Sequence, residues 1–305
     1  MSALATAPLT DVKEFVNGEY FSHVGASLAA STVDGYRKMW RMAEKYFEGR
    51  GLNLRTCECQ AIMRQICADH PKLRKTSLSH LKNFFSGIWS HALRMGLTEN
   101  DNPWRVVQIP QAPEPGETHA YTPAEIETLL TKTPKPYDLV VLLAACTGLR
   151  KSEIRGLRWS DWDPETSTLW VRRAVWRSHE KETKSKASRA PVPVVPVLAA
   201  RLNEIMPAGG NKPIFAGSTG KPLDLDNLAR RIIVPAVGKT WVGWHAFRRS
   251  LATFLNSRGV PLKVIQSILR HSNLSVTERC YVKTLGEDVR DAMSKVNFGC
   301  TEVTT

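Results

Sequence analysis

Residues 147–156 read TGLRKSEIRG and follow directly after an apolar run at residues 139–146. A glycine at the end of an apolar helix is a common stop signal, so we expect a buried helix that ends at Gly148 and a short second helix over residues 151–156. Arg150 would then be held on the tight turn between the two helices. A guanidinium fixed in this way suits a phosphate group, because it donates two parallel hydrogen bonds and keeps its charge at neutral pH.

A change of composition marks the start of the domain that contains this turn. Residues 110–118 hold three prolines and one glycine and show no hydrophobic periodicity, which is typical of a linker. Thr122 and Glu125 then have the spacing of a capping box, with Pro123 at the first helical position. We therefore expect a first domain at residues 1–107, a linker at 108–120, and a second domain with a carboxy-terminal tail at 121–305.

The first domain is predicted to be helical and basic. Apolar residues recur every three or four positions from Val33 to Phe47, with Thr32 as the expected N-cap, and a second such helix is expected over residues 76–95. Lysine and arginine side chains, among them Arg37, lie between the apolar positions. This pattern predicts a helical bundle with a basic outer side.

The second domain is predicted to combine strands and helices. Residues 168–176 are rich in Val, Trp and Thr, and residues 192–197 form a second extended run whose prolines suit an edge strand. A polar, basic hairpin tip lies between these runs, and helices are expected again over residues 244–258 and 261–270. The expected fold is therefore mainly α with a small antiparallel β-sheet, an α+β architecture.

The charge of the chain indicates a polyanionic partner. Its 305 residues include 42 Lys plus Arg against 29 Asp plus Glu, a formal net charge of +13. Lysine and arginine side chains that cover phosphates gain affinity by releasing counterions. Because no amphipathic basic helix suggests a membrane surface, nucleic acid is the expected partner.

Composition also bears on the compartment of the protein. No apolar run approaches the roughly 20 residues that cross a bilayer, and residues 1–10 lack the features of a secretion signal, so we expect a cytoplasmic protein. The first helical domain is predicted to begin within about 10 to 30 residues of Met1, and we expect no additional amino-terminal module before it. Cys57 and Cys59 are too close together for the usual zinc spacing, and the six cysteines are expected to be reduced and mostly buried.

Three further segments place cations, and in one case a tyrosine, where a site that cleaves phosphodiesters requires them. Lys184 lies at the expected hairpin tip, from which a lysine can swing to a leaving group and donate a proton. His245 and Arg248 are three residues apart and therefore share one face of a helix. His271 precedes Tyr281 by ten residues.

In order and spacing, these segments resemble the tyrosine recombinases, also called phage integrases. That family has an Arg, a Lys, a His-x-x-Arg pair, a His or Trp, and a Tyr in this order. The resemblance covers most of the region from Tyr121 to about Arg290, and the helical, basic segment before the linker resembles the family's core-binding domain. It implies a site-specific DNA recombinase or integrase that cleaves and rejoins DNA through a 3′-phosphotyrosyl intermediate, with no metal, cofactor or ATP.

The resemblance assigns a role to each matching residue. Arg150 and Arg248 match the pair that clamps the scissile phosphate, and Tyr281 matches the nucleophile. His245 and His271 match two supporting positions. Attack on a phosphodiester builds negative charge on its oxygens, and preorganised cations of this kind stabilise that charge.

Two of these assignments have an alternative. Lys184 matches the lysine that protonates the departing 5′ oxygen, but Lys186 is close enough that the choice between them stays open. In many members the nucleophile follows the histidine by nine residues, which falls on Cys280 in this chain. Tyr281 remains the expected nucleophile because the Val and Lys that follow it resemble the residues after the family tyrosine.

The resemblance also implies an assembly on double-stranded DNA. Family members act as homotetramers on two DNA sites, so we expect a monomer in free solution, a tetramer on DNA, and a location at the nucleoid in the cytoplasm. The residues after Tyr281 would form a tail that docks on a neighbouring subunit. Two other functions stay open: a DNA-binding protein of the same fold that has lost its catalysis, and a type IB topoisomerase-like enzyme that relaxes DNA without exchanging partners.

Overall fold

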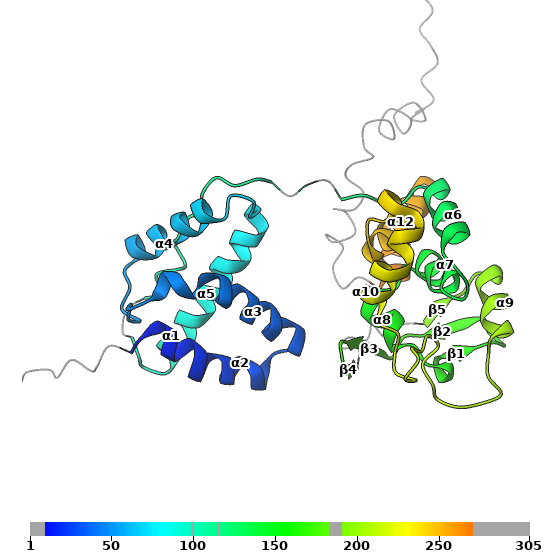
Figure 1. Ribbon diagram of the computed structural model, residues 1–305, viewed down its shortest axis with the longest axis horizontal. Coiled ribbons are helices and arrows are strands. Elements are labelled where there is room, and N and C mark those ends of the chain that lie inside the picture. The colour runs from blue at the N-terminus through cyan, green and yellow to red at the C-terminus, as the bar shows by residue number, and fades with distance from the viewer. Residues whose placement is uncertain (1–9, 99–100, 115, 117, 183–190, 271–305) are drawn as a thin grey trace, which may run out of the picture. The chain divides into compact units, whose positions relative to one another are not determined.

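The computed structural model describes residues 10–98, 101–114, 116, 118–182 and 191–270 (Figure 1). The chain divides into two units, residues 1–117 and 118–305. Unit 1 is helical throughout its described elements, whereas unit 2 combines helices with two small antiparallel sheets. The predicted fold class, mainly α with a small antiparallel β component, is confirmed.

Unit 1 packs its helices around an aromatic core. Its elements are α1 (Val12–Phe15), η1 (Val16–Tyr20), α2 (Phe21–Ser27), α3 (Ala30–Ala43), η2 (Glu44–Phe47), α4 (Thr56–Asp69) and α5 (Lys75–Arg94). The helix α5 runs through the middle of the unit and buries Phe84, Phe85 and Trp89 (Figure 1). The rings of Phe85 and Trp89 lie close to Phe47 and Trp104, which are also fully buried.

The helix boundaries in unit 1 correct part of the prediction. The helix expected over residues 76–95 is confirmed as α5. In contrast, α3 begins at Ala30 after an extended Ala29 that makes no side-chain cap, so Thr32 is not the N-cap. The short connection from α2 therefore sets the start of α3 and overrides the local capping preference of threonine. Phe47 lies beyond α3, in the 3₁₀ turn η2, where it still reaches the core.

Unit 2 is built around the apolar helix α7. Its helical elements are α6 (Pro123–Lys132), α7 (Asp138–Thr147), α8 (Lys151–Gly156), η3 (Trp159–Asp161), α9 (Pro196–Glu204), α10 (Leu225–Leu228), η5 (Ala229–Ile233), α11 (Val234–Val237), η6 (Gly238–Thr240), α12 (Trp244–Ser257) and α13 (Leu262–Leu269). The predicted capping box is confirmed, since the Glu125 carboxylate accepts a 2.7 Å hydrogen bond from the Thr122 backbone N–H. The predicted helices before and after Gly148 are confirmed as α7 and α8.

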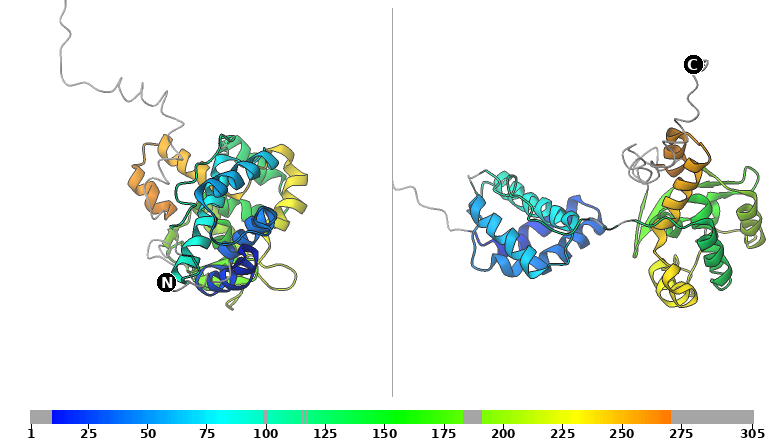
Figure 2. Two further views of the ribbon diagram at one scale, coloured as in Figure 1. Left: turned by 90° about the vertical axis from the view of Figure 1, so that its left-hand side faces the viewer. Right: turned by 90° about the horizontal axis from the view of Figure 1, so that it is seen from above.

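The strands of unit 2 form two separate antiparallel sheets. One has the order β1-β2-β5, with β1 (Trp162–Asp163), β2 (Thr168–Trp170) and β5 (Pro191–Pro193). The other is a hairpin of β3 (Arg173–Trp176) and β4 (His179–Glu182). Figure 2 shows the same elements from two further sides. The proline-containing β5 lies at a sheet edge, as predicted, because proline cannot donate a ladder hydrogen bond.

The single strand expected over residues 168–176 is two strands in different sheets. The second of them, β3, packs against α8, where a Cβ on Gly156 would lie 2.5 Å from the Arg173 carbonyl oxygen. This close approach requires a glycine on α8 and draws β3 away from the first sheet. The extended run expected to reach Val197 is also shorter, since Pro196 begins α9.

Two other expectations concern cysteines and membrane spans. Of the cysteines that the structure describes, Cys59 is buried, Cys67 and Cys146 are partly buried, and Cys57 is exposed, so the expectation of mostly buried thiols is wrong for Cys57. Within the described ranges, none of the helices combines the length and the apolar character that crossing a membrane requires.

Candidate active site

Arg150 is placed by the turn between α7 and α8. Gly148 closes α7 in the left-handed conformation, with φ 58° and ψ 21°. Leu149 then points into the core, and Arg150 takes the extended N-cap position before α8. This geometry agrees with the predicted position of Arg150 on a tight turn. A glycine suits the turn because other residues pay a steric cost at positive φ.

The carboxylate of Glu153 fixes Arg150 at this turn. Its Oε2 atom accepts a 2.8 Å hydrogen bond from the Arg150 backbone N–H, and its Oε1 atom accepts one of 2.8 Å from Arg150 Nη1. The Glu153 side chain is 4% exposed, while that of Arg150 is 39% exposed. One end of Arg150 is therefore anchored inside the protein and the other remains accessible to an incoming anion.

Arg248 approaches the same turn from α12. Its Nη1 atom donates a 2.8 Å hydrogen bond to the Gly148 carbonyl oxygen, and its Nη2 atom donates to the Leu269 carbonyl oxygen. The residue is 2% exposed. Arg248 thus connects the end of α7 to the end of α13, and its guanidinium is held by backbone groups from both.

His245 lies one helical turn before Arg248 on α12. Although the side chain is exposed, partial desolvation of its ring lowers its pKa, and the nearby charges of Arg249, Arg248 and Arg150 lower it further. These effects favour the neutral ring, which has one N–H that can donate a hydrogen bond. The influence of Arg150 and Arg248 on His245 also indicates that the three groups lie near one another.

Arg270, which has no predicted role, joins this group. It follows the last residue of α13, is 3% exposed, and its Nη2 atom lies 2.7 Å from Glu153 Oε2. Burial lowers the pKa of its guanidinium, and the Glu153 carboxylate opposes that shift. We call Arg150, His245, Arg248 and Arg270, together with Glu153, the cation cluster.

Glu153 also had no predicted role, and a sequence signal for it exists. It stands three residues after Arg150, the spacing at which a glutamate caps the start of a helix. Arg270 offers no such signal, because its contact with Glu153 joins residues 117 positions apart.

The remaining predicted site residues, Lys184, His271 and Tyr281, lie outside the described residues, as do Lys186 and Cys280. Of the predicted set, the structure therefore places Arg150, His245 and Arg248. In the part of the chain that the structure describes, no group of three or more His, Cys, Asp or Glu side chains is arranged to hold a metal ion.

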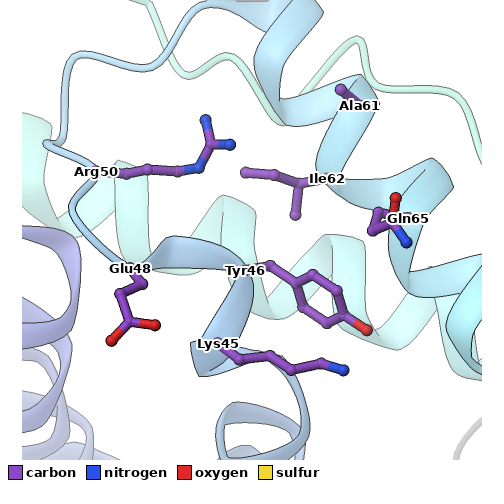
Figure 3. Close-up of a pocket in the computed structure, with 7 residues that line it drawn as sticks. All are labelled: Lys45, Tyr46, Glu48, Arg50, Ala61, Ile62 and Gln65. Carbon is purple, nitrogen blue, oxygen red and sulfur yellow. The ribbon is translucent and has the colours of Figure 1, made fainter.

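A separate hollow of about 290 Å³ lies in unit 1 between η2 and α4 (Figure 3). Its lining is Lys45, Tyr46, Glu48, Arg50, Ala61, Ile62 and Gln65. Lys45 and Tyr46 both contact the Asp69 carboxylate, at 3.3 and 2.7 Å. The charge of Lys45 in this hollow is thus balanced by Asp69, whereas the cation cluster of unit 2 holds three arginines and one carboxylate.

The cation cluster falls inside a segment with known relatives. Residues 120–287 match the model of the phage integrase family. The chain belongs to this family. The matched residues include Arg150, His245 and Arg248, and they also include Lys184, His271 and Tyr281.

Phage integrase relatives resemble this chain over differing shares of their length. A tyrosine recombinase XerC-like protein of Caldanaerobacter subterraneus subsp. tengcongensis is 28% identical in an alignment of 257 residues that covers 72% of this chain and 66% of the relative. An integrase of Mycobacterium phage D29 is 29% identical over 204 residues, 59% of this chain and 54% of the relative. Tyrosine recombinase XerD of Pseudomonas aeruginosa is 28% identical over 273 residues, 82% of this chain and 86% of the relative. The chain thus spans no more than 66% of the length of the first two.

Solved integrase structures share the fold. The Tn1549 transposon integrase in complex with circular intermediate DNA superposes with a TM-score of 0.77 at 19% identity, covering 95% of this chain and 100% of that one. A lambda integrase dimer bound to a COC′ core site gives 0.68 at 15% identity, covering 97% and 81%.

Proposed function

We propose that this chain is a site-specific DNA recombinase of the integrase type. The observation that best supports the proposal is the convergence of two anchored arginines on one turn. Arg248 is hydrogen-bonded to Gly148, and Arg150, two residues further on, is held by Glu153. Fixed guanidinium groups of this kind suit a phosphodiester, whose oxygens gain negative charge as attack proceeds.

The proposed reaction uses a covalent protein–DNA intermediate. The Tyr281 oxygen attacks the scissile phosphorus as its proton passes to a base in the site, and a 3′-phosphotyrosyl ester forms. The bond to the 5′ oxygen breaks at the same time, and that oxygen takes a proton from Lys184. Arg150 and Arg248 would stabilise the charged transition state, with His245 and His271 in support. A 5′ hydroxyl from another strand then attacks the ester and releases Tyr281, so resealing needs no ATP and no metal ion.

Double-stranded DNA is the proposed partner. The net charge of +13 supports it, because a basic chain gains affinity by releasing counterions from phosphates. In this proposal residues 1–107 clamp the duplex from one side, residues 108–120 are the linker, and residues 121–305 carry the catalysis. Such a protein would act at the nucleoid in the cytoplasm.

A homotetramer on DNA is part of the proposal, with a monomer in free solution. An apolar groove of about 650 Å³ between α6, α7 and α12 supports it, since Phe254 on its rim is 45% exposed. We propose that the groove receives residues 282–305 of a second copy, which include Ala292, Met293 and Val296.

Light scattering after size exclusion tests this assembly. On DNA that brings full-length chains together as tetramers, a chain that ends at residue 281 should remain monomeric.

The chemistry is tested with supercoiled plasmid in EDTA and without ATP. The wild-type protein should relax the plasmid and become covalently attached to DNA. Tyr281→Phe should lose both activities, while Cys280→Ser, the matched control at the neighbouring position, should keep them. Loss in Cys280→Ser alone would move the nucleophile to Cys280, and salt-sensitive DNA binding without any adduct would indicate a non-catalytic DNA-binding protein.

Strand exchange separates a recombinase from a topoisomerase. Two duplexes of different length, both carrying a sequence that the wild-type protein selects from a randomised pool, should yield products of exchanged length. Relaxation and adduct formation without exchanged products would instead support the type IB topoisomerase-like function.

The leaving-group proton donor is tested by sulfur substitution. A duplex with sulfur in place of the departing 5′ oxygen needs little protonation, since a thiolate is a much better leaving group than an alkoxide. Lys184→Ala should therefore be slow on the oxygen duplex and recover on the sulfur duplex, whereas Lys186→Ala should show no such selective recovery. The reverse pattern would assign the proton donor to Lys186.

A further inference from the structure

Arg270 occupies an unusual position for an arginine. It follows α13 in the left-handed conformation, with φ 54° and ψ 46°, and it is 3% exposed. A non-glycine residue is strained in this conformation, and a buried guanidinium adds a desolvation cost. Interactions elsewhere in the site must offset these costs.

The contact that Arg270 makes is shared with Arg150. The two Glu153 oxygens lie 2.8 Å from Arg150 Nη1 and 2.7 Å from Arg270 Nη2. All three side chains meet at the start of α8, and those of Glu153 and Arg270 are almost fully buried. The carboxylate is thus held between two guanidinium groups in a setting where solvent screens little of their charge.

The shared carboxylate solves an electrostatic problem of the site. Glu153 alone would orient Arg150 but would also offset the positive charge that a phosphate needs. With Arg270 on the other side of the carboxylate, the trio keeps one net positive charge. Arg150 can therefore be fixed in place without losing its attraction for an anion.

Arg270 also has unused donors. Its Nε and Nη1 atoms are buried and have no hydrogen-bond partner among the described residues. A buried pair of atoms without partners is unfavourable, and a purely structural ion pair would gain little from such an arrangement. Within the described part of the chain, the contacts of Arg270 thus leave two of its donor atoms unpaired.

We propose that Arg270 is a positioning residue for Arg150 and acts through Glu153. Arg270 holds the Glu153 carboxylate, which orients Arg150, and balances the negative charge of that carboxylate. The proposal rests on the proposed recombinase function, because its effect is measured as phosphodiester cleavage. It extends that function by one residue that lies outside the predicted catalytic set.

The test compares full-length variants on a duplex that the wild-type protein selects from a randomised pool. Arg270→Gln leaves Arg150 as the cation paired with Glu153, so the carboxylate offsets the charge of Arg150. Covalent adduct formation should then slow about tenfold, less than the roughly 100-fold loss typical of a direct oxyanion donor. Arg270→Lys keeps the charge and should stay closer to the wild-type rate. The combined Glu153→Gln, Arg270→Gln variant removes both charges and should be faster than Arg270→Gln alone.

A neutral substrate gives the second readout. In a duplex with a methyl group in place of one non-bridging oxygen of the scissile phosphate, the reacting group carries no negative charge. The difference between the wild-type protein and Arg270→Gln should shrink on this duplex if Arg270 acts by charge. A change that acts only through folding would slow both duplexes alike and lower the thermal unfolding midpoint.

The outcomes separate the two proposals. A wild-type protein that forms no adduct with any selected duplex overturns the proposed function. Adduct formation by the wild-type protein with an equal rate in Arg270→Gln overturns the role of Arg270 alone, as does an equal defect on both duplexes. A combined variant slower than Arg270→Gln also overturns it, because Arg270 would then act on the DNA directly rather than through Glu153.

Discussion

Arg248 Nη1 donates a 2.8 Å hydrogen bond to the carbonyl oxygen of Gly148, a residue 100 positions earlier in the chain. Gly148 ends α7 at positive φ, and residues of α12 and α13 lie directly against it. A Cβ at this position would lie 2.9 Å from Leu269 Cδ2 and 3.1 Å from Leu251 Cδ2. The glycine therefore ends a helix, accepts a hydrogen bond from a site arginine, and leaves room for two further helices.

Gly148→Ala should reduce both stability and cleavage. The left-handed conformation costs an alanine roughly 1–2 kcal/mol, and the steric contacts add about 1–3 kcal/mol. The shift of α12 and α13 needed to relieve those contacts would move Arg248 away from its acceptor. The free energy of unfolding and the rate of covalent adduct formation measure the two effects.

Gly259→Ala is the matched control for this change. Gly259 also has positive φ, 74°, and belongs to the same unit, but nothing lies within 4 Å of a Cβ built on it. It should show only the conformational cost and keep the wild-type rate of adduct formation. Equal losses in both variants would mean that the contacts around Gly148 contribute nothing to the site.

The protonation of His245 should respond to the arginines around it. Partial desolvation and the charges of Arg249, Arg248 and Arg150 lower its pKa below the usual value of about 6.5. A group with a lowered pKa in the folded state stabilises the protein above pH about 6.5, and this contribution is lost as the pH falls. An NMR titration of the ring should therefore have its midpoint below that pH, and Arg150→Gln should raise the midpoint. A midpoint unchanged by Arg150→Gln would contradict the proximity of these groups.

The sequence predicted well those features that depend on residues close together in the chain. The capping box of Thr122 and Glu125 and the end of α7 at Gly148 each involve neighbouring residues. The shared face of His245 and Arg248 follows from helical spacing alone. Such features are encoded locally, so a single sequence is sufficient to predict them.

Features that depend on distant contacts could not be predicted in this way. The role of Glu153 as a bridge to Arg270 depends on a contact across 117 positions. The division of residues 168–176 into β2 and β3 depends on the fit of Arg173 against Gly156. Neither spacing nor propensity reports such contacts, because packing between elements decides them.

Asn102 should prove important for the stability of unit 1. Its side chain is buried, donates to the Ser86 carbonyl at 2.8 Å and to Ser90 Oγ at 2.9 Å, and accepts from the Trp104 backbone N–H. It thereby ties the segment with Trp104 to α5. Asn102→Ala should lower the free energy of unfolding by about 2 kcal/mol, since it leaves buried polar groups without partners.

The exposed Asn53 provides a control of the same residue type in unit 1. Asn53→Ala should change the free energy of unfolding by no more than about 0.5 kcal/mol, as is usual for surface substitutions. Urea denaturation of the full chain, followed by tryptophan fluorescence, measures both variants. An effect of Asn102→Ala as small as that of Asn53→Ala would show that water replaces the lost hydrogen bonds.

A buried histidine in unit 1 should make the stability of the protein depend on pH. The ring of His91 on α5 stacks on that of His23, with centroids 4.0 Å apart, and Phe15 lies on it at 5.8 Å. Burial lowers the pKa of His91, as do His23 and Arg94, whereas Glu19, 3.6 Å away, opposes the shift.

Because the folded state lowers the pKa of His91, its contribution to stability is present above the unfolded value of about 6.5 and is lost as the pH falls. His91→Phe removes the titrating group and keeps a ring against Phe15 and His23. Calorimetry of the full chain should therefore show that the unfolding midpoint of the wild-type protein falls more steeply below pH about 6.5 than that of His91→Phe. Parallel slopes in the two proteins would mean that the stacked histidines do not control the acid sensitivity of unit 1.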